Sequence, residues 1–276
     1  MAAAETTEDQ RSLTEEERRT LAAMRARHPG ADPLGMLPEL SPLQIPRHIA
    51  VIMDGNGRWA QARGMPRVMG HAAGAESVGR VIRGCAGIGV EALTLYSFSS
   101  ENWKRPPEEV QALMSLLVEH SDKERDRLVQ ENIRFRRIGR REGLPPEALA
   151  ALDSVEEATS GCTGLTLCVA INYGSRAEIT DAVRSIARDV AAGRLRPEEI
   201  DEGAIEARLD TAGLPEPDLM IRTAGEMRLS NYLLWQLSYA ELHVTKTLWP
   251  DFGEADLYAA VRDFASRTRK FGGLCG

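Results

Sequence analysis

A run of apolar residues near position 50 stops abruptly at a carboxylate. Residues 49–53 are Ile-Ala-Val-Ile-Met, and Asp54-Gly55-Asn56-Gly57 follows at once. An unbroken apolar run of this length predicts a strand that is buried on both faces, which is typical of parallel sheets covered by helices. The two glycines predict a sharp turn directly after the strand.

This turn has two interpretations. It can be a simple tight turn, because Asp-Gly and Asn-Gly are common turn dipeptides. It can also lead into a helix that begins at Gly57 or Arg58, whose free N–H groups would bind a phosphate with help from the Arg58 guanidinium. In that case Asp54 would hold a metal ion that bridges the phosphates.

Further strands and helices alternate along the chain. Strands are predicted at residues 92–98, 132–139, 165–171, 218–222 and 241–244. Helices are predicted from residues 71, 107, 144 and 251 onward, around the apolar stripe of residues 179–190, and at residues 232–237, whereas residues 61–70 are expected to form a loop. This order predicts one α/β domain with a central, mostly parallel six-stranded sheet flanked by helices.

Composition limits the classes of protein that remain. Residues 1–45 contain a possible short helix beginning at Ser12-Leu13-Thr14-Glu15 and then four prolines, with a fifth at Pro46. We expect them to be a peripheral, extended and partly mobile N-terminal extension of a domain spanning residues 46–276. The net charge of −7 argues against a nucleic-acid partner. The four cysteines lack metal-ligand spacing, and no apolar run approaches the roughly 18 residues of a membrane span, so a cytoplasmic protein is expected.

Polar sets follow three of the predicted strands. They are residues 54–58, 99–105 and 222–230. In open α/β sheets, ligands bind beyond the carboxyl ends of the strands. Three polar sets in this position therefore predict an active site at one edge of the sheet.

The sequence as a whole resembles the cis-prenyltransferases, specifically the undecaprenyl diphosphate synthase-like enzymes. The motifs are HIAVIMDGNGRWA, RVMGHAAG, LYSFSSENWKRP, DLMIRTAGEMRLSNYLLWQLSYAEL and LWPDF, in this order over roughly residues 46–273. The resemblance implies a catalytic domain at residues 46–276 that condenses isopentenyl diphosphate with an allylic diphosphate, in the first place farnesyl diphosphate. It also implies Mg²⁺, a homodimer, cis double bonds in the product, and peripheral contact with a membrane when the product leaves.

The resemblance assigns roles to named residues. Asp54 would hold Mg²⁺ together with Glu241, and Glu226 is a weaker metal candidate. The allylic diphosphate would be bound by Gly55, Asn56, Gly57, Arg58, Trp59, Arg67 and His71. Isopentenyl diphosphate would be bound by Arg222, Arg228, Leu229 and Ser230.

A loop after the second predicted strand would cover the reacting carbons. Its residues are Ser99, Ser100, Glu101, Asn102, Trp103 and Arg105. The resemblance makes Asn102 catalytic in the removal of a proton, but a neutral amide is a very weak base, so it would orient the substrate or relay the proton. Trp103 would line the path of the prenyl chain.

Product length is predicted from one small side chain. The resemblance places Ser97 on the wall of the tunnel for the growing chain, where a small residue favours a medium-to-long product such as undecaprenyl diphosphate. The alternatives are a short-chain cis-prenyl diphosphate synthase and a non-catalytic partner subunit. Met227 and Lys270 depart from the family pattern, in which a polar residue or histidine and an arginine are common.

Overall fold

Six parallel strands form one sheet at the centre of the protein. The computed structural model describes residues 12–269, and the strand order is β3-β4-β2-β1-β5-β6. The strands are β1 (His48–Ile52), β2 (Ala92–Ser99), β3 (Arg134–Ile138), β4 (Thr166–Tyr173), β5 (Leu219–Arg222) and β6 (Glu241–Val244). Every neighbouring pair is parallel, which confirms the predicted fold class.

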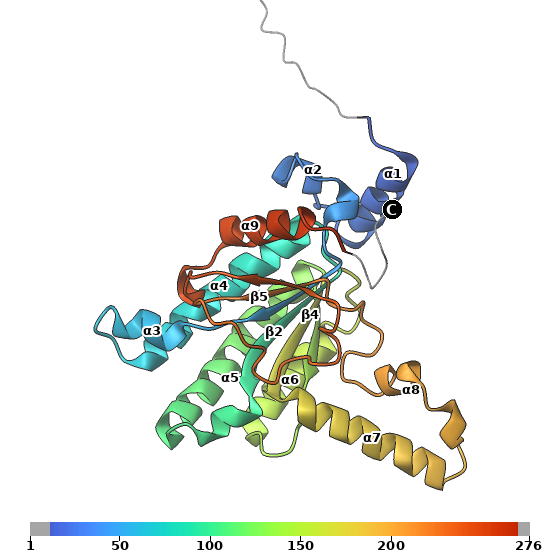
Figure 1. Cartoon of the computed structure of the whole chain (residues 1–276). Helices are drawn as coiled ribbons and strands as arrows, with labels where there is room; N and C mark the ends of the chain where they lie inside the picture. The colour runs from blue at the N-terminus through green and yellow to red at the C-terminus, as the bar shows by residue number, and fades with distance from the viewer. Residues whose placement is uncertain (1–11, 270–276) are drawn as a thin grey trace, which may run out of the picture.

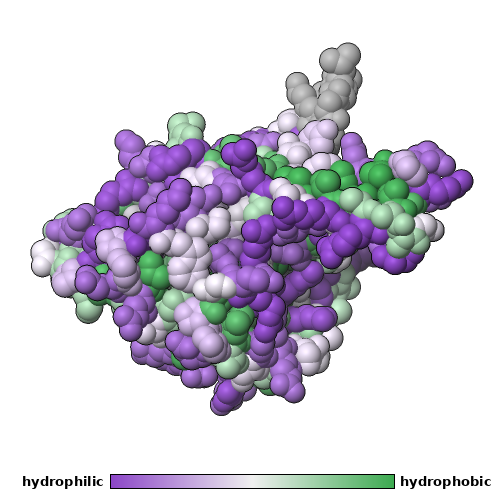
Figure 2. All heavy atoms as spheres, turned by 90° about the horizontal axis from the view of Figure 1, so that it is seen from below, coloured by the Kyte–Doolittle hydropathy of each residue, from purple (hydrophilic) through white to green (hydrophobic). Residues whose placement is uncertain are grey.

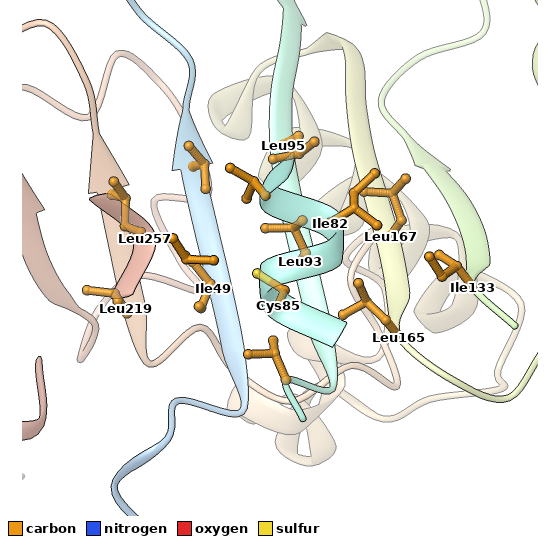
Figure 3. Close-up of a cluster of buried hydrophobic side chains, with 14 of the residues drawn as sticks. Ile49, Ile82, Cys85, Leu93, Leu95, Ile133, Leu165, Leu167, Leu219 and Leu257 are labelled. Atoms are coloured by element: carbon orange, nitrogen blue, oxygen red, sulfur yellow. The ribbon is translucent and has the colours of Figure 1, made fainter. Parts of the chain in front are cut away.

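Helices cover one face of the sheet. They are α4 (Arg67–Gly87), α5 (Pro107–Gln130), α6 (Pro146–Ala158) and α9 (Glu254–Ala265), with α4 and α9 side by side in Figure 1. Ile82 and Cys85 of α4 lie over Ile49, Leu93 and their neighbours on the strands (Figure 3). These buried contacts make the larger of the two apolar clusters, because each strand presents every second side chain to this face.

The opposite face is covered differently. Its apolar cluster joins strand residues such as Ala50 and Ala170 to Tyr232, Leu233 and Leu237 of the segment after β5. Helix α7 (Ser175–Ala191) follows β4 and projects beyond the sheet together with α8 (Glu202–Glu206) (Figure 1). Figure 2 shows a mostly hydrophilic surface from below, with hydrophobic side chains gathered toward the side where α7 and α8 lie.

Two local predictions are wrong. Residues 61–70 are not a loop throughout, because α3 spans Asn56–Gln61 and α4 begins at Arg67, directly after Pro66. Residues 232–237 form turns and not a helix. Asn231 (φ 60°) and Leu233 (φ 43°) have left-handed backbone conformations, which an α-helix of L-residues does not accommodate.

The expectation of an extended segment is wrong for the described part of the N-terminal extension. It contains α1 (Glu15–Arg27), α2 (Pro33–Met36) and a 3₁₀ turn, η1 (Pro42–Gln44). The helix begins with a capping box of Thr14 and Glu17, two residues after the predicted start. Two of the prolines, Pro33 and Pro42, stand at the first positions of α2 and η1, where they favour a helical turn. Leu21, Met24 and Leu37 are buried.

A buried histidine fixes the beginning of β1. His48 is fully buried, with Nδ1 2.7 Å from the Pro215 carbonyl oxygen and Nε2 2.7 Å from Thr94 Oγ1. Burial lowers the pKa of His48 to about 4, so the imidazole is neutral. Its Nδ1–H therefore donates to Pro215 and its Nε2 accepts the Thr94 hydroxyl proton.

Within residues 12–269, no helix is both long and apolar enough to cross a membrane.

Candidate active site

The carboxyl ends of β1, β2 and β5 bring the three predicted polar sets together. They surround a hollow of about 580 Å³, which we call the polar hollow. Its walls include Asp54 and Asn56, then Ser99, Glu101, Asn102 and Arg105, then Arg222, Arg228 and Ser230. These side chains come from positions as much as 176 residues apart, from Asp54 to Ser230.

Asp54 lies between two arginines. Its Oδ2 atom is 3.1 Å from Nη2 of Arg222, and its Oδ1 atom is 3.3 Å from Nη2 of Arg58 and accepts the Gly55 N–H at 2.7 Å. Burial alone would raise the pKa of Asp54, but the Arg222 hydrogen bond and the charges of both arginines outweigh it and hold the pKa below its ordinary value. Asp54 is therefore a carboxylate at neutral pH.

Arg222 is the buried centre of this set. Its side chain is 4% exposed. Besides Asp54, it donates to Ser230 Oγ at 2.9 Å and to the Arg228 carbonyl oxygen. The Thr223 hydroxyl next to it donates to the Asp54 carbonyl oxygen at 2.6 Å, so the end of β5 is tied to the end of β1.

A smaller hollow of about 140 Å³ lies beside Asp54, and we call it the anion pocket. It is lined by Met53, Asp54, Gly55, Asn56, Gly57, Arg58, Arg67, His71 and Arg105. Gly55 has φ +107°, which favours glycine, and a Cβ on Gly57 would lie 2.6 Å from the Arg67 guanidinium. The two glycines therefore let the chain turn and let Arg67 approach, as the sequence predicted.

His71 is neutral and stands where the hollows meet. Burial, followed by the charge of Arg105, lowers its pKa to about 4. Nε2 of His71 and Oδ1 of Asn56 are buried and have no hydrogen-bond partner within the described part of the chain. Unpaired polar atoms of this kind are costly without a ligand, so both suit a binding site.

The loop after β2 places Asn102 with a defined orientation. Its Oδ1 atom accepts the Ser99 N–H at 3.1 Å, at the start of the 3₁₀ turn η2 (Ser100–Lys104). Because the carbonyl oxygen of the amide is used in this way, the remaining amide group is a donor of hydrogen bonds. Glu101 accepts a hydrogen bond from Asn231 at 2.8 Å, which links this loop to the segment after β5.

Four predicted binding residues do not line either hollow. Trp59 donates to Asp251 at 2.6 Å and carries Arg63 on its ring, Ser100 donates to Glu101, and Leu229 packs against the apolar cluster around Tyr232. Trp103 donates to Asn172 at 2.8 Å and borders a separate hollow on the outer side of α5. These residues shape the surroundings of the site.

Glu241 is not brought to Asp54. It begins β6 in register with Leu219, at the amino end of the strands, whereas Asp54 follows the carboxyl end of β1. It forms an ion pair with Arg267 at 2.9 Å. Asp54 by itself still fits Mg²⁺, because this ion is commonly held by one or two carboxylates together with substrate phosphates.

An apolar hollow of about 200 Å³, which we call the hydrocarbon cavity, lies next to the polar hollow, between α4, α5 and the sheet. The two share Met53, Asn56, His71, Ser97 and Leu113 as walls. Ser97 therefore lies at the junction, at the level where the sequence analysis placed the tunnel. Beyond it the cavity is lined by residues such as Val78, Ile82 and Leu117.

Sequence reasoning missed two residues that organise the site. Glu109 contacts Arg105 at 3.0 Å and Arg67 at 3.5 Å, and its spacing of four residues from Arg105 on a helix was a usable signal. Asn231 lines the polar hollow one position after Ser230. Of the two departures from the family pattern, Met227 is 87% exposed, and Lys270 lies outside the described residues.

The fold and the hollows define a class of protein: an α/β protein with an arginine-lined hollow at the carboxyl edge of its sheet beside an apolar cavity. The family model described as "Putative undecaprenyl diphosphate synthase" matches residues 52–272. The chain therefore belongs to the undecaprenyl diphosphate synthase family, the cis-prenyltransferases, and is a prenyl transferase.

Individual relatives agree with the family. An isoprenyl transferase of Rhizobium meliloti is 52% identical over 236 residues, which are 86% of this chain and 96% of that protein. The ditrans,polycis-undecaprenyl-diphosphate synthase of Xanthomonas axonopodis pv. citri is 50% identical and covers 83% of this chain and 89% of its own. The solved structure of lavandulyl diphosphate synthase from Lavandula x intermedia has a TM-score of 0.82 at 38% identity, covering 83% of this chain and 99% of that chain.

Proposed function

We propose that the protein condenses isopentenyl diphosphate with an allylic diphosphate, farnesyl diphosphate being the first choice, to give a cis-polyprenyl diphosphate such as undecaprenyl diphosphate. One observation carries the proposal: a cationic hollow and an apolar cavity share a wall at His71 and Ser97. A prenyl diphosphate has the same two parts. The specificity of the Xanthomonas relative, named as a farnesyl-diphosphate-specific undecaprenyl diphosphate synthase, supports the starter and the product.

The reaction breaks the bond between the allylic carbon and the diphosphate oxygen, and a new carbon–carbon bond forms to isopentenyl diphosphate, which loses a proton. Arg58 and Arg67 would bind the departing diphosphate and stabilise its developing negative charge. Arg222, Arg228 and Ser230 would bind the second diphosphate. Mg²⁺, which Asp54 would hold together with diphosphate oxygens, supplies further neutralisation of that charge.

Asn102 is not the base in this proposal. Its amide oxygen already accepts the Ser99 N–H, and its NH₂ group can only donate hydrogen bonds. We assign it to the orientation of a diphosphate oxygen, which then takes the proton of isopentenyl diphosphate. The neutral His71 would donate or accept a hydrogen bond where the polar hollow meets the hydrocarbon cavity.

The proposal includes a cytoplasmic homodimer that contacts a membrane surface when it releases the product. Exposed apolar side chains support such contacts: Leu242 on the edge strand β6 is 45% exposed, and Val183 on α7 is 52% exposed. Sedimentation of the purified protein would determine the oligomeric state.

A short-chain cis-prenyl diphosphate synthase is the second candidate. The small volume of the hydrocarbon cavity, about 200 Å³, favours it. A non-catalytic partner subunit is disfavoured, since Asp54, Arg222 and Arg228 are all present and face one hollow.

One experiment decides among these functions. Purified protein is incubated with Mg²⁺, isopentenyl diphosphate and dimethylallyl, geranyl or farnesyl diphosphate, and the products are measured by mass spectrometry. We expect successive additions of isoprene units to farnesyl diphosphate. Products that stop after the first additions would favour the short-chain function, and no product with any starter would contradict the proposed activity.

A further inference from the structure

The far end of the hydrocarbon cavity carries charged side chains beside apolar ones. Along α5, the apolar wall residues Leu113 and Leu117 are followed by His120, Ser121, Glu124 and Arg127, all of which line the same cavity. At about 1.5 Å per helical residue, Arg127 lies about 21 Å further along α5 than Leu113. A space for hydrocarbon thus begins at the polar hollow and reaches the charged side chains of Glu124 and Arg127, next to the apolar Leu128 and Phe135.

Arg127 fills the gap between α5 and α4. Its Nη1 atom lies 3.2 Å from the position that a Cβ on Gly79 would take, so the guanidinium rests against the backbone of α4. Glu124 forms an ion pair with it one turn earlier, and Glu131 Oε1 lies 3.9 Å from Nε of Arg127 one turn later. The guanidinium is therefore held in place from both sides along α5.

These charges are incompletely satisfied. Nε of Arg127 is shielded from solvent and has no hydrogen-bond partner among the described residues, whereas Oε2 of Glu124, which is also shielded, contacts Nη2 of Arg127 in the ion pair. Charges beside apolar walls are costly unless they are fully paired, and packed hydrophobic residues commonly replace such pairs without loss of stability. The two side chains are 30% and 32% exposed, so the pair itself contributes little to stability.

We propose that Arg127, held by Glu124, closes the hydrocarbon cavity and limits the length of the prenyl chain; this inference rests on the proposed function. Each condensation adds carbons at the diphosphate end and pushes the tail toward α5 residues 124–127. Hydrocarbon cannot hydrogen-bond to a guanidinium or a carboxylate, so a tail that reaches the pair gains nothing from going further.

The size of the cavity agrees with an early limit. An apolar cavity of about 150 Å³ holds benzene, with six carbons, and the cavity here measures about 200 Å³. A long chain would therefore need the walls of α4 and α5 to move apart, and the Arg127 guanidinium lies between them, against Gly79.

The test compares Arg127→Leu and the double variant Glu124→Leu/Arg127→Leu with the wild-type protein. The double variant removes both charges, so that no carboxylate is left unpaired. Lys123→Ala is the matched control, because Lys123 is an exposed cation on the same helix that does not line the cavity. Each protein is given Mg²⁺, isopentenyl diphosphate and farnesyl diphosphate, and chain lengths are measured by mass spectrometry.

We expect the most abundant product of both variants to be longer by at least one isoprene unit, and Lys123→Ala to give the wild-type distribution. The rate of the first condensation should stay within about twofold of wild type, because the reacting carbons lie roughly 20 Å away. An unchanged or shortened distribution in the folded double variant would overturn the role of Arg127. Failure of the wild-type protein to form any product would contradict the proposed function instead.

Discussion

Replacing Arg222 by lysine tests whether the site needs the guanidinium group, which contacts partners in two directions, or only its positive charge. The side chain is 4% exposed and serves Asp54 on one side and Ser230 on the other. A lysine ammonium keeps the charge but cannot reproduce both directions. We expect the loss of one charge-assisted hydrogen bond, about 1.5–3 kcal/mol, which lowers kcat/KM for isopentenyl diphosphate by about ten- to a hundredfold.

The assay is steady-state kinetics in which isopentenyl diphosphate is varied at saturating allylic diphosphate. Arg228→Lys is the matched variant, because Arg228 is 59% exposed and its side chain pairs with Glu226 alone in the described structure, so its loss should be less than about tenfold. The midpoint of thermal unfolding of Arg222→Lys should fall by roughly 3–12 °C. A kcat/KM within about threefold of wild type would refute the reasoning.

Four further predictions concern the site and the fold. Asp54→Ala should keep its circular dichroism spectrum but lose turnover by several orders of magnitude, and turnover within about tenfold of wild type would remove Asp54 from the metal role. Arg58→Ala should mainly raise the KM for the allylic substrate and Arg228→Ala mainly the KM for isopentenyl diphosphate, each by about ten- to a hundredfold. Equal losses for both substrates in both variants would argue against two sites. Ser97→Leu should shift products to short chains while sparing the first condensation, and chromatography showing unchanged lengths would mean that Ser97 does not face the growing chain. The pKa of His48 is lowered to about 4 in the folded protein, so its contribution to the free energy of unfolding is complete above about pH 6.5 and is lost as the pH falls toward 4. The loss is about 3 kcal/mol, at about 1.4 kcal/mol per pH unit. If urea unfolding of His48→Gln showed the same decline with pH, this assignment to His48 would be contradicted.

The strands could be predicted from the sequence because their burial leaves a clear pattern. Residues 49–53, 92–98 and 165–171 are apolar on both faces, and polar residues follow each at the carboxyl edge. That edge is where the site formed. The predicted set around Asp54 and the set around Arg222 therefore met, although nothing local to either stretch indicates the other.

The errors have local physical causes. The prolines of residues 29–46 suggested an extended segment, but proline also suits the first turn of a helix, and buried side chains such as Leu37 hold that segment to the domain. The apolar run 232–237 resembled a helix, but left-handed backbone at Asn231 and Leu233 turns it back over the sheet. Neither backbone conformation is visible in the pattern of apolar residues.

Topology alone could have separated Glu241 from Asp54. In a parallel sheet all strands begin at one edge and end at the other, and the sequence already placed Glu241 at the first position of its strand. A residue there lies at the edge opposite to the site. The family resemblance suggested a shared metal ligand, and the sheet of a single chain does not permit it.

Carboxylates link the arginines of the site in pairs. Glu226 contacts both Arg58, at 3.4 Å, and Arg228. Arg58 belongs to the stretch predicted to bind the allylic diphosphate and Arg228 to the stretch predicted to bind isopentenyl diphosphate, so a single carboxylate bridges the two. A diphosphate that took one arginine from Glu226 would leave this carboxylate to its other partner, so we expect the two binding events to be coupled through one side chain.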